Sequence, residues 1–348
     1  MIDRSVQSAQ TIGFIDRHAR LIALSILLIG LLIRLPFLAI DFGKTTDISV
    51  YAQWAGRIQA QGLINLYAPG GLVNYPPLFL YWLAAAGSIR PADAALVALI
   101  KLPSILADVL TAAIMMALIW KRSRRAAVVV GAVYLFNPAI WYVSAYWGQT
   151  DALYTLFLVC ALGLLAHDRS TWAWIIFSLA LMTKIQSLAV LPLFVVATLS
   201  RRNKIDLVRG GLAAIAVIAL ITLPWWLSGK ASLMIQSWFL TPNSVSRVDI
   251  SAYNFWYLAL GSQVHAVTAS AHPFNWTVSY RLLGFGVYGA FLALATLLIW
   301  RSQARSIFLA GTILNLGLFV LFIDIHERYL FPAIALSLLA AVIDARLR

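Results

Sequence analysis

The sequence is poor in charge, in cysteine and in acidic side chains. Only 11% of its 348 residues are charged and 62% are hydrophobic, whereas an average soluble domain is about 25% charged. A soluble globule of this composition would expose large apolar areas, and disorder or a coiled coil would need far more charge. The single cysteine, Cys160, excludes an intrachain disulfide. With a mean hydropathy of +0.86, the chain is predicted to be a polytopic helical membrane protein.

Long apolar runs fill most of the chain. A helix needs about 20 residues to cross about 30 Å of hydrocarbon. We predict one domain, residues 1–348, whose ten spans lie near 21–40, 96–120, 126–145, 150–167, 171–184, 186–199, 207–227, 281–300, 306–323 and 329–345. The fifth and sixth are short and meet at Lys184, which predicts either tilted helices or a re-entrant pair. The apolar stretch 75–89 is short for a span, so it fits either an eleventh span or an interfacial helix.

Basic residues choose between these two topologies. With 75–89 at the interface and the N-terminus in the cytoplasm, sixteen of the 26 lysines and arginines face inward and seven face outward. If 75–89 spanned, the basic groups in 121–125, 201–209 and 301–305 would move outward, against the positive-inside rule. We therefore predict ten spans with both termini inside. The net charge of +13 is then a topology signal, and we expect no nucleic-acid partner.

Two long segments, 41–95 and 228–280, are predicted to lie outside. In the first, Asp47, Tyr51 and Trp54 share one helical face through their i, i+4, i+7 spacing. An amphipathic interfacial helix with Asp47 as its N-cap explains the same pattern. Tyr75 precedes a Pro-Pro pair that stiffens the return to the membrane, and a plain helix entry explains that pair equally well.

Polar residues recur at other outer boundaries. Gln149 and Asp151 lie in a short turn between spans three and four, where Asp151 can cap a helix and Gln149 has no capping role. Lys184, between two short spans, must either snorkel or meet an anion. Asn254 and Trp256 combine an amide with an aromatic ring, which suits sugar recognition or an interfacial belt.

The densest polar cluster lies at an outer boundary near the C-terminal end. Asp324, His326, Glu327 and Arg328 fall within five positions, and Glu327 is the only glutamate in the chain. Glu327 and Arg328 can form a local ion pair, yet ionisable groups next to a membrane commonly have a function. The spacing does not indicate a metal site, because His326 has no histidine partner at i+4.

The order of these motifs resembles the GT-C superfamily of polyprenyl-phosphate-sugar-dependent glycosyltransferases. Within it, the closest likeness is to the glucosyltransferases and mannosyltransferases that extend lipid-linked oligosaccharides. The likeness is carried by Asp47 to Trp54, Tyr75 to Leu78, Ala107 with Asp108, Asn137 with Pro138, Lys184 with Gln186, Asn254 to Trp256, and His326 to Arg328. The chain departs from the family where Ile185 separates Lys184 from Gln186, and in the turn 148–151, which is not rich in histidine.

This resemblance implies an all-α, GT-C-like bundle of about ten transmembrane helices with outer juxtamembrane helices. It implies inverting hexosyl transfer from a polyprenyl-phosphate-linked sugar donor to a lipid-linked saccharide or other cell-envelope acceptor, at the non-cytoplasmic face of the bilayer. The compact chain and its short loops indicate a prokaryotic inner membrane. No metal or other cofactor is implied.

The resemblance also assigns roles to individual residues. Asp47 would be the general base, with Asp41 or Asp151 as the next candidates. Lys184, His326 and Arg328 would bind the donor phosphate. The remaining candidates for substrate contact are Tyr51, Trp54, Tyr75, Gln149, Asp151, Gln186, Asn254, Trp256 and Glu327.

Two other classes of protein remain open. A transporter or flippase of a lipid-linked saccharide would also need an outer polar cavity, although transporters usually carry repeats and polar groups at the midplane. A non-catalytic membrane subunit predicts no dense outer cluster of acids and bases. The feature that separates these classes is whether Asp47 and the cluster around His326 converge in one outer cavity.

Overall fold

The computed structural model describes residues 4–38, 40, 47–68, 73–89, 92–201, 203–239, 246–273 and 277–344. The described chain is a helical bundle, which confirms the predicted class of an all-α polytopic membrane protein. Its α-helices are α1 (Arg4–Arg34), α2 (Asp47–Gln61), α3 (Pro77–Ser88), α4 (Asp93–Trp120), α5 (Arg124–Leu135), α6 (Pro138–Trp141), α7 (Asp151–Ala166), α8 (Ser170–Thr183), α9 (Leu191–Arg201), α10 (Lys204–Leu227), α11 (Ala231–Phe239), α12 (Phe255–Leu260), α13 (Tyr280–Arg301), α14 (Ile307–Leu321) and α15 (Phe331–Ile343).

Each predicted span coincides with helical structure, but few of the helices are long. Within the described residues, four are long and apolar enough to cross a membrane by length and composition: Arg17–Phe37, α4, α10 and α13. A bent pair, α5 with Pro138–Tyr146, would make a fifth, and its two parts meet at 49°. The other predicted spans are shorter helices.

The predicted span 126–145 is a bent pair of helical segments. The helix stops after Leu135 and restarts at Pro138. The Asn137 side chain accepts a hydrogen bond from the Ala139 amide at 3.0 Å, so it caps the new helix while Pro138 occupies its first position. Proline suits that position because its missing N–H would have no partner there. After α6 the chain continues as a π-helical segment, Tyr142–Tyr146, called the π segment below.

Lys184 marks a second break. It has an extended backbone, with φ −154° and ψ 125°, between the end of α8 and a 3₁₀ segment, Ile185–Val190, that leads into α9. The fifth and sixth predicted spans are therefore two separate helical pieces. The break lets Lys184 turn inward between α7 and the C-terminal region, where it lies only 3% exposed.

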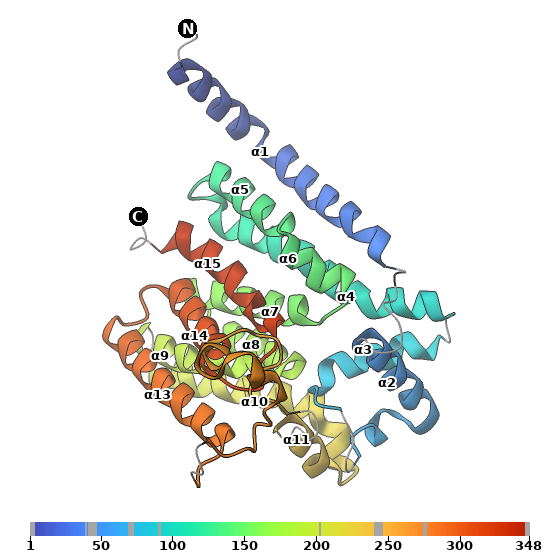
Figure 1. The fold of residues 1–348 in the computed structure, drawn as a ribbon. Coiled ribbons are helices and arrows are strands. Elements are labelled where there is room, and N and C mark those ends of the chain that lie inside the picture. The colour runs from blue at the N-terminus through green and yellow to red at the C-terminus, as the bar shows by residue number, and fades with distance from the viewer. Residues whose placement is uncertain are drawn as a thin grey trace.

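The two ends of the bundle differ (Figure 1). The start of α1 and the end of α15 lie toward one end, and α2, α3 and α11 gather at the opposite end. As predicted, α2 is amphipathic, and Ile48, Tyr51, Trp54, Ala55 and Ile58 are buried. With 12 residues, α3 rises about 18 Å, well short of the hydrocarbon thickness. Its length therefore favours the interfacial placement of 75–89.

Candidate functional site

Asp47 begins α2 and takes part in a chain of hydrogen bonds. Gln149 donates from its Nε2 atom to Oδ2 of Asp47. The Oε1 atom of Gln149 accepts a hydrogen bond from the Tyr51 hydroxyl at 3.2 Å, and the hydroxyls of Tyr51 and Tyr75 are 2.8 Å apart. The structure thus brings together four predicted residues from three separate segments. Gln149 is fully buried, so the Asp47 carboxylate is held by a fixed amide donor.

Gly148 allows Gln149 to approach α2 this closely. Its φ is +77°, in the left-handed region that favours glycine. A Cβ atom at this position would lie 2.3 Å from Cδ1 of Ile48 and 3.0 Å from Cγ of Lys101. The turn therefore needs glycine both for its backbone conformation and for its contact with α2.

A second cluster joins two cations to one carboxylate. The Nζ atom of Lys184 lies 2.8 Å from both oxygens of Asp151. The Nε atom of Arg328 lies 3.7 Å from Oδ2 of Asp151. All three side chains are buried, and within the described structure Arg328 Nε has no hydrogen-bond partner. The cluster therefore has an unused N–H donor. Its two cations share a single carboxylate, so these three side chains together carry one net positive charge.

Aromatic rings surround the two cations. Lys184 Nζ lies 4.7 Å from the ring centre of Tyr329 and 5.4 Å from that of Tyr154, and the Arg328 guanidinium lies 5.0 Å from the Trp147 ring. Such cation–π contacts stabilise partly desolvated cations. The sequence analysis missed these three aromatic residues, although each is within three positions of a predicted polar site residue.

His326 is an uncharged member of the site. Its burial and the nearby charges of Arg328 and Lys184 lower the pKa of His326 to about 3. At neutral pH its imidazole can therefore donate or accept a hydrogen bond but carries no charge.

Electrostatic effects connect the two halves of the site. Partial burial raises the pKa of Glu327, and the negative charges of Asp151 and Asp47 add to this against the opposing charge of Arg328. Burial alone would lower the pKa of Arg328, but Tyr329, Asp151 and further groups including Asp47 raise it. The contacts agree, because Gln149 holds Asp47 while Asp151, two residues further on, contacts Arg328. Two sites on the same side of the membrane are separated by an even number of spans. The predicted topology in which 75–89 is not a span has an even number of spans between Asp47 and the 326–328 cluster.

The carboxylate partner of Arg328 is Asp151, not its sequence neighbour Glu327. The N-cap of α7 is Thr150, so Asp151 uses its carboxylate on the two cations. The capping explanation of Asp151 and the local ion pair of Glu327 with Arg328 are both replaced by these contacts.

Asn254 and Trp256 do not have the geometry that the sequence analysis expected. Asn254 Nδ2 donates to the carbonyls of Phe319 and Phe322, both at 3.1 Å, and its Oδ1 accepts from the Trp256 amide at 3.0 Å. The indole of Trp256 donates to the Leu321 carbonyl at 2.9 Å. Their polar atoms are engaged with backbone, so these side chains fasten the outer loop to the end of α14. The prediction that they contact a sugar is replaced by this structural role.

Trp54 and Gln186 complete the predicted set. The buried Trp54 packs against the two tyrosines whose hydroxyls are hydrogen-bonded. The centre of its ring lies 5.5 Å from the ring centre of Tyr51 and 5.6 Å from that of Tyr75. The buried Oε1 atom of Gln186, two residues after Lys184 in the chain, has no hydrogen-bond partner within the described residues. Asp41, the alternative base, lies outside the described residues.

Comparison with known proteins agrees with this architecture. The family model described as GPI transamidase subunit PIG-U matches residues 53–263. The chain belongs to the PIG-U family. Among curated proteins no relative matches this PIG-U family member. The PIG-U family differs from the glucosyltransferases and mannosyltransferases, to which the sequence motifs show the closest predicted likeness.

Solved structures identify the fold. ArnT from Cupriavidus metallidurans bound to undecaprenyl phosphate shares 17% identity with a TM-score of 0.55, and its apo state shares 18% with a TM-score of 0.57. These matches cover 96% and 91% of this PIG-U family member, which spans 60% and 59% of the ArnT chains. The fold is therefore similar to that of ArnT, which agrees with the predicted GT-C-like bundle of helices.

Proposed function

We propose that this chain is an inverting glycosyltransferase of a prokaryotic inner membrane. It moves a hexose from a polyprenyl-phosphate-sugar donor to a lipid-linked saccharide or other cell-envelope acceptor on the non-cytoplasmic face. The observation that carries the proposal is a single turn in which Gln149 holds the carboxylate of Asp47 and Asp151, two residues further on, holds two buried cations. The ArnT-like fold supports a lipid-linked donor.

The cation cluster binds the donor phosphate. Lys184 and Arg328 provide charge-assisted hydrogen bonds, and the free Nε of Arg328 is available for one of them. His326 adds an uncharged N–H. A phosphate leaving group needs little protonation because it is a weak base, but it needs stabilisation of the charge that develops as the bond breaks. These three residues supply that stabilisation.

Asp47 acts on the acceptor. It accepts the proton of the attacking hydroxyl while the hydroxyl oxygen forms a bond to C1 of the sugar. The bond from C1 to the phosphate oxygen breaks on the opposite face, and polyprenyl phosphate leaves with the electron pair. A single displacement of this kind inverts C1. Gln149 fixes the orientation of Asp47, and Tyr51, Tyr75, Gln186 and Glu327 remain as candidates for contacts with the sugars.

An apolar cavity, lined in part by residues that flank Lys184 in the chain, fits the lipid chain of the donor. The cavity has a volume of about 210 Å³ and lies between α8, the segment leading into α9, and α10. Leu181 and Leu188 line it on either side of Lys184 in the chain, and Trp174 and Phe177 line it further along α8. A lipid whose phosphate is bound at Lys184 can therefore lay the first part of its tail in this cavity.

Gly211→Leu is expected to raise the KM of a long-chain polyprenyl donor by about tenfold. The leucine would displace about two methylene groups of the lipid from the cavity, and the lost burial of two methylene groups weakens binding by about that factor. Gly211 lines the cavity and has open space where a side chain would begin, so leucine fills the cavity without a backbone clash. The control is Gly286→Leu on α13, where the space is also open. Donors with long and short chains are compared, and an equal rise in KM for both would contradict this placement of the tail.

The orientation gives another expected result. In a Cys160→Ser background, a single cysteine at the exposed Ser262 is expected to react with a membrane-impermeant thiol reagent in intact cells. Single cysteines at the exposed Lys121 and Lys204 are expected to react only after permeabilisation. The opposite labelling pattern would place the site on the cytoplasmic face.

The proposal is tested with purified protein and a panel of synthetic polyprenyl-phosphate sugars plus a lipid-linked saccharide acceptor. The expected result is transfer of one sugar, or slow hydrolysis without acceptor, detected as polyprenyl phosphate and product by mass spectrometry. A transporter or flippase would move an intact lipid-linked saccharide across liposomes and would leave the donor bond unbroken.

A second candidate function is favoured by the family match over residues 53–263. The chain would be a non-catalytic subunit that binds a lipid-linked glycan through the same outer cations and presents it to another protein. Both functions predict donor binding at Lys184 and Arg328. Only the glycosyltransferase predicts that the purified chain cleaves the bond between sugar and phosphate.

A further inference from the structure

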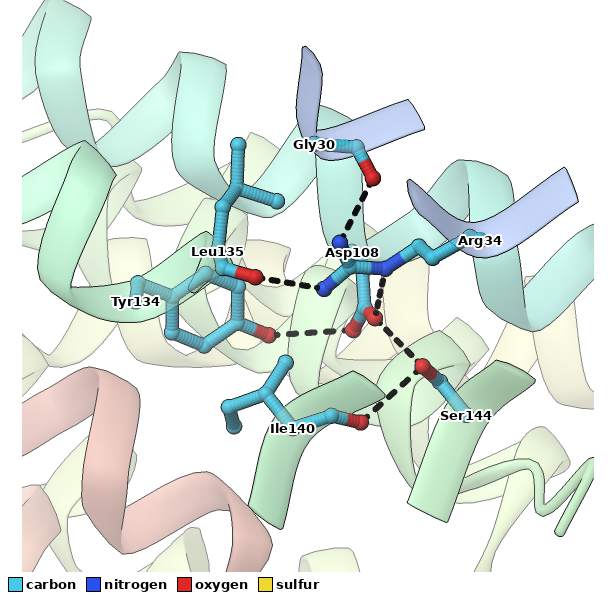
Figure 2. A network of polar contacts seen from close by, with 7 residues as sticks. All are labelled: Gly30, Arg34, Asp108, Tyr134, Leu135, Ile140 and Ser144. Carbon is cyan, nitrogen blue, oxygen red and sulfur yellow. Dashed lines mark hydrogen bonds and ion pairs between the residues drawn. The ribbon is translucent and has the colours of Figure 1, made fainter. Parts of the chain in front are cut away.

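A buried ion pair lies away from the proposed substrate contacts (Figure 2). Arg34 from α1 places its Nε atom 2.9 Å from Oδ2 of Asp108 on α4, and both side chains are fully buried. Its other guanidinium nitrogens donate to the carbonyls of Gly30 at 2.7 Å and Leu135 at 3.1 Å. Arg34 therefore ties the ends of α1 and α5 to the middle of α4.

Asp108 has further partners beyond Arg34. Ser144, in the π segment, donates its hydroxyl to Oδ2 of Asp108, and Tyr134 donates to Oδ1 at 3.4 Å. A buried ion pair is often no more stabilising than well-packed apolar residues of similar volume. Charged residues inside a membrane bundle commonly serve a function. The stability of the bundle alone is thus a weak reason for this network.

The same helix holds the π segment at a second point. Lys101, seven residues before Asp108 and hence on the same face of α4, donates to the Tyr146 carbonyl at 2.9 Å. It also donates to the carbonyls of Phe37 at 3.0 Å and Ile40 at 2.7 Å. Asp108 and Lys101 therefore form hydrogen bonds with the π segment near its middle and at its end.

The π segment in turn holds Gln149. The backbone N–H of Gln149 donates to the carbonyl of Val143, the residue before Ser144, at 2.9 Å. The side-chain amide of Gln149 donates to Asp47. The path from Asp108 through Ser144, Val143 and Gln149 to Asp47 is thus a continuous series of bonds. π-helical turns frequently occur at functional sites.

We propose that Asp108, Lys101 and Ser144 are positioning residues that set the orientation of Asp47 through the π segment and Gln149. They contact neither donor nor acceptor. The effect on catalysis rests on the proposed function, whereas the effect on the π segment does not. If the orientation is lost, the reacting groups separate, and misplacement of about 1 Å can cost about a hundredfold in rate.

The decisive variant is Ser144→Ala, which removes the hydroxyl that links Asp108 to the π segment, together with the contact of that hydroxyl with the Ile140 carbonyl at 3.0 Å. We expect kcat to fall by about ten- to a hundredfold with the donor KM unchanged, and Ser144→Thr to retain most of the activity through its hydroxyl. Hydrogen exchange, followed by mass spectrometry on the peptide covering 142–150, is expected to become faster, while a peptide from α8 exchanges as in the wild type.

The matched control is Tyr134→Phe, which removes another hydrogen bond to Asp108 but leaves the π segment untouched. A role in stability alone predicts similar effects of the two variants. The positioning role predicts that Tyr134→Phe keeps wild-type kcat and wild-type exchange in 142–150.

Unchanged exchange of 142–150 in Ser144→Ala overturns the proposal, and so does faster exchange with wild-type kcat. If the wild type cleaves no donor, the proposed function fails by itself. In that case the positioning role is tested by the donor affinity and by the hydrogen exchange of the α2 peptide that contains Asp47. The positioning role requires faster exchange in that peptide for Ser144→Ala with donor affinity unchanged, and wild-type exchange there overturns it.

Discussion

Asp47→Asn is expected to lower kcat by about 10²–10⁴-fold, the usual contribution of a general base. Asparagine keeps the size of the side chain and an oxygen that can accept from Gln149, but it cannot take the proton of the acceptor hydroxyl. Donor binding should change little, because Lys184 and Arg328 remain paired with Asp151. The measurement is steady-state transfer by purified protein, with donor affinity determined separately.

The matched control is Asp93→Asn. Asp93 is an exposed aspartate in the first turn of α4, on the outer side of the predicted topology. The same chemical change there should leave kcat near the wild-type value. Near-normal turnover in Asp47→Asn would show that another group accepts the proton, and Asp151 would be the next residue to test.

Asp151→Asn is expected to destabilise the protein by about 3–5 kcal/mol, the cost of removing one partner from a buried ion pair. Two buried cations, Lys184 and Arg328, would lose their shared carboxylate. Thermal unfolding in detergent measures the loss as a lower Tm. Because a phosphate can replace the missing charge, added undecaprenyl phosphate should raise the Tm of Asp151→Asn more than that of the wild type.

The double variant Asp151→Asn with Lys184→Met tests the charge argument. Removing one cation together with the carboxylate leaves one buried charge in place of two, so the double variant should be more stable than the sum of the single effects predicts. Additive losses of stability would contradict a direct charge interaction between Asp151 and Lys184. A Tm of Asp151→Asn that does not respond to undecaprenyl phosphate would contradict the phosphate site.

Sequence patterns located the parts of the site that depend on local geometry. The spacing of Asp47, Tyr51 and Trp54 predicted one buried helical face, because residues at i, i+4 and i+7 share a face whatever the helix packs against. Lys184 was expected to meet an anion or to snorkel, because an ammonium group within apolar spans needs a partner. In the structure its partner is a protein carboxylate.

The long-range pairings could not be predicted. Asp151 lies 33 residues from Lys184 in sequence, and Asp108 lies 74 residues from Arg34. Helix packing determines which charged groups meet, and the sequence alone does not specify it. Asn254 and Trp256 show the converse, since their amide and indole suit a sugar in composition, yet the backbone at the end of α14 occupies their polar atoms.

Two functions have been proposed for the same site. The transferase proposed above starts from the ArnT-like fold, and the non-catalytic subunit proposed above starts from the match to the PIG-U family. Both proposals predict donor binding at Lys184 and Arg328. Only the transferase needs Asp47 to be oriented as a base, which the contact with Gln149 achieves.

The release of polyprenyl phosphate by the purified chain tests this account most directly. Wild-type protein is mixed with a polyprenyl-phosphate sugar, with and without a lipid-linked saccharide acceptor, and the released polyprenyl phosphate is measured over time. The account predicts release that the acceptor accelerates and that Asp47→Asn slows by about 10²–10⁴-fold, with inversion at C1 in the product. Donors that bind at Lys184 and Arg328 but are never cleaved, across the whole panel of sugars, would contradict it.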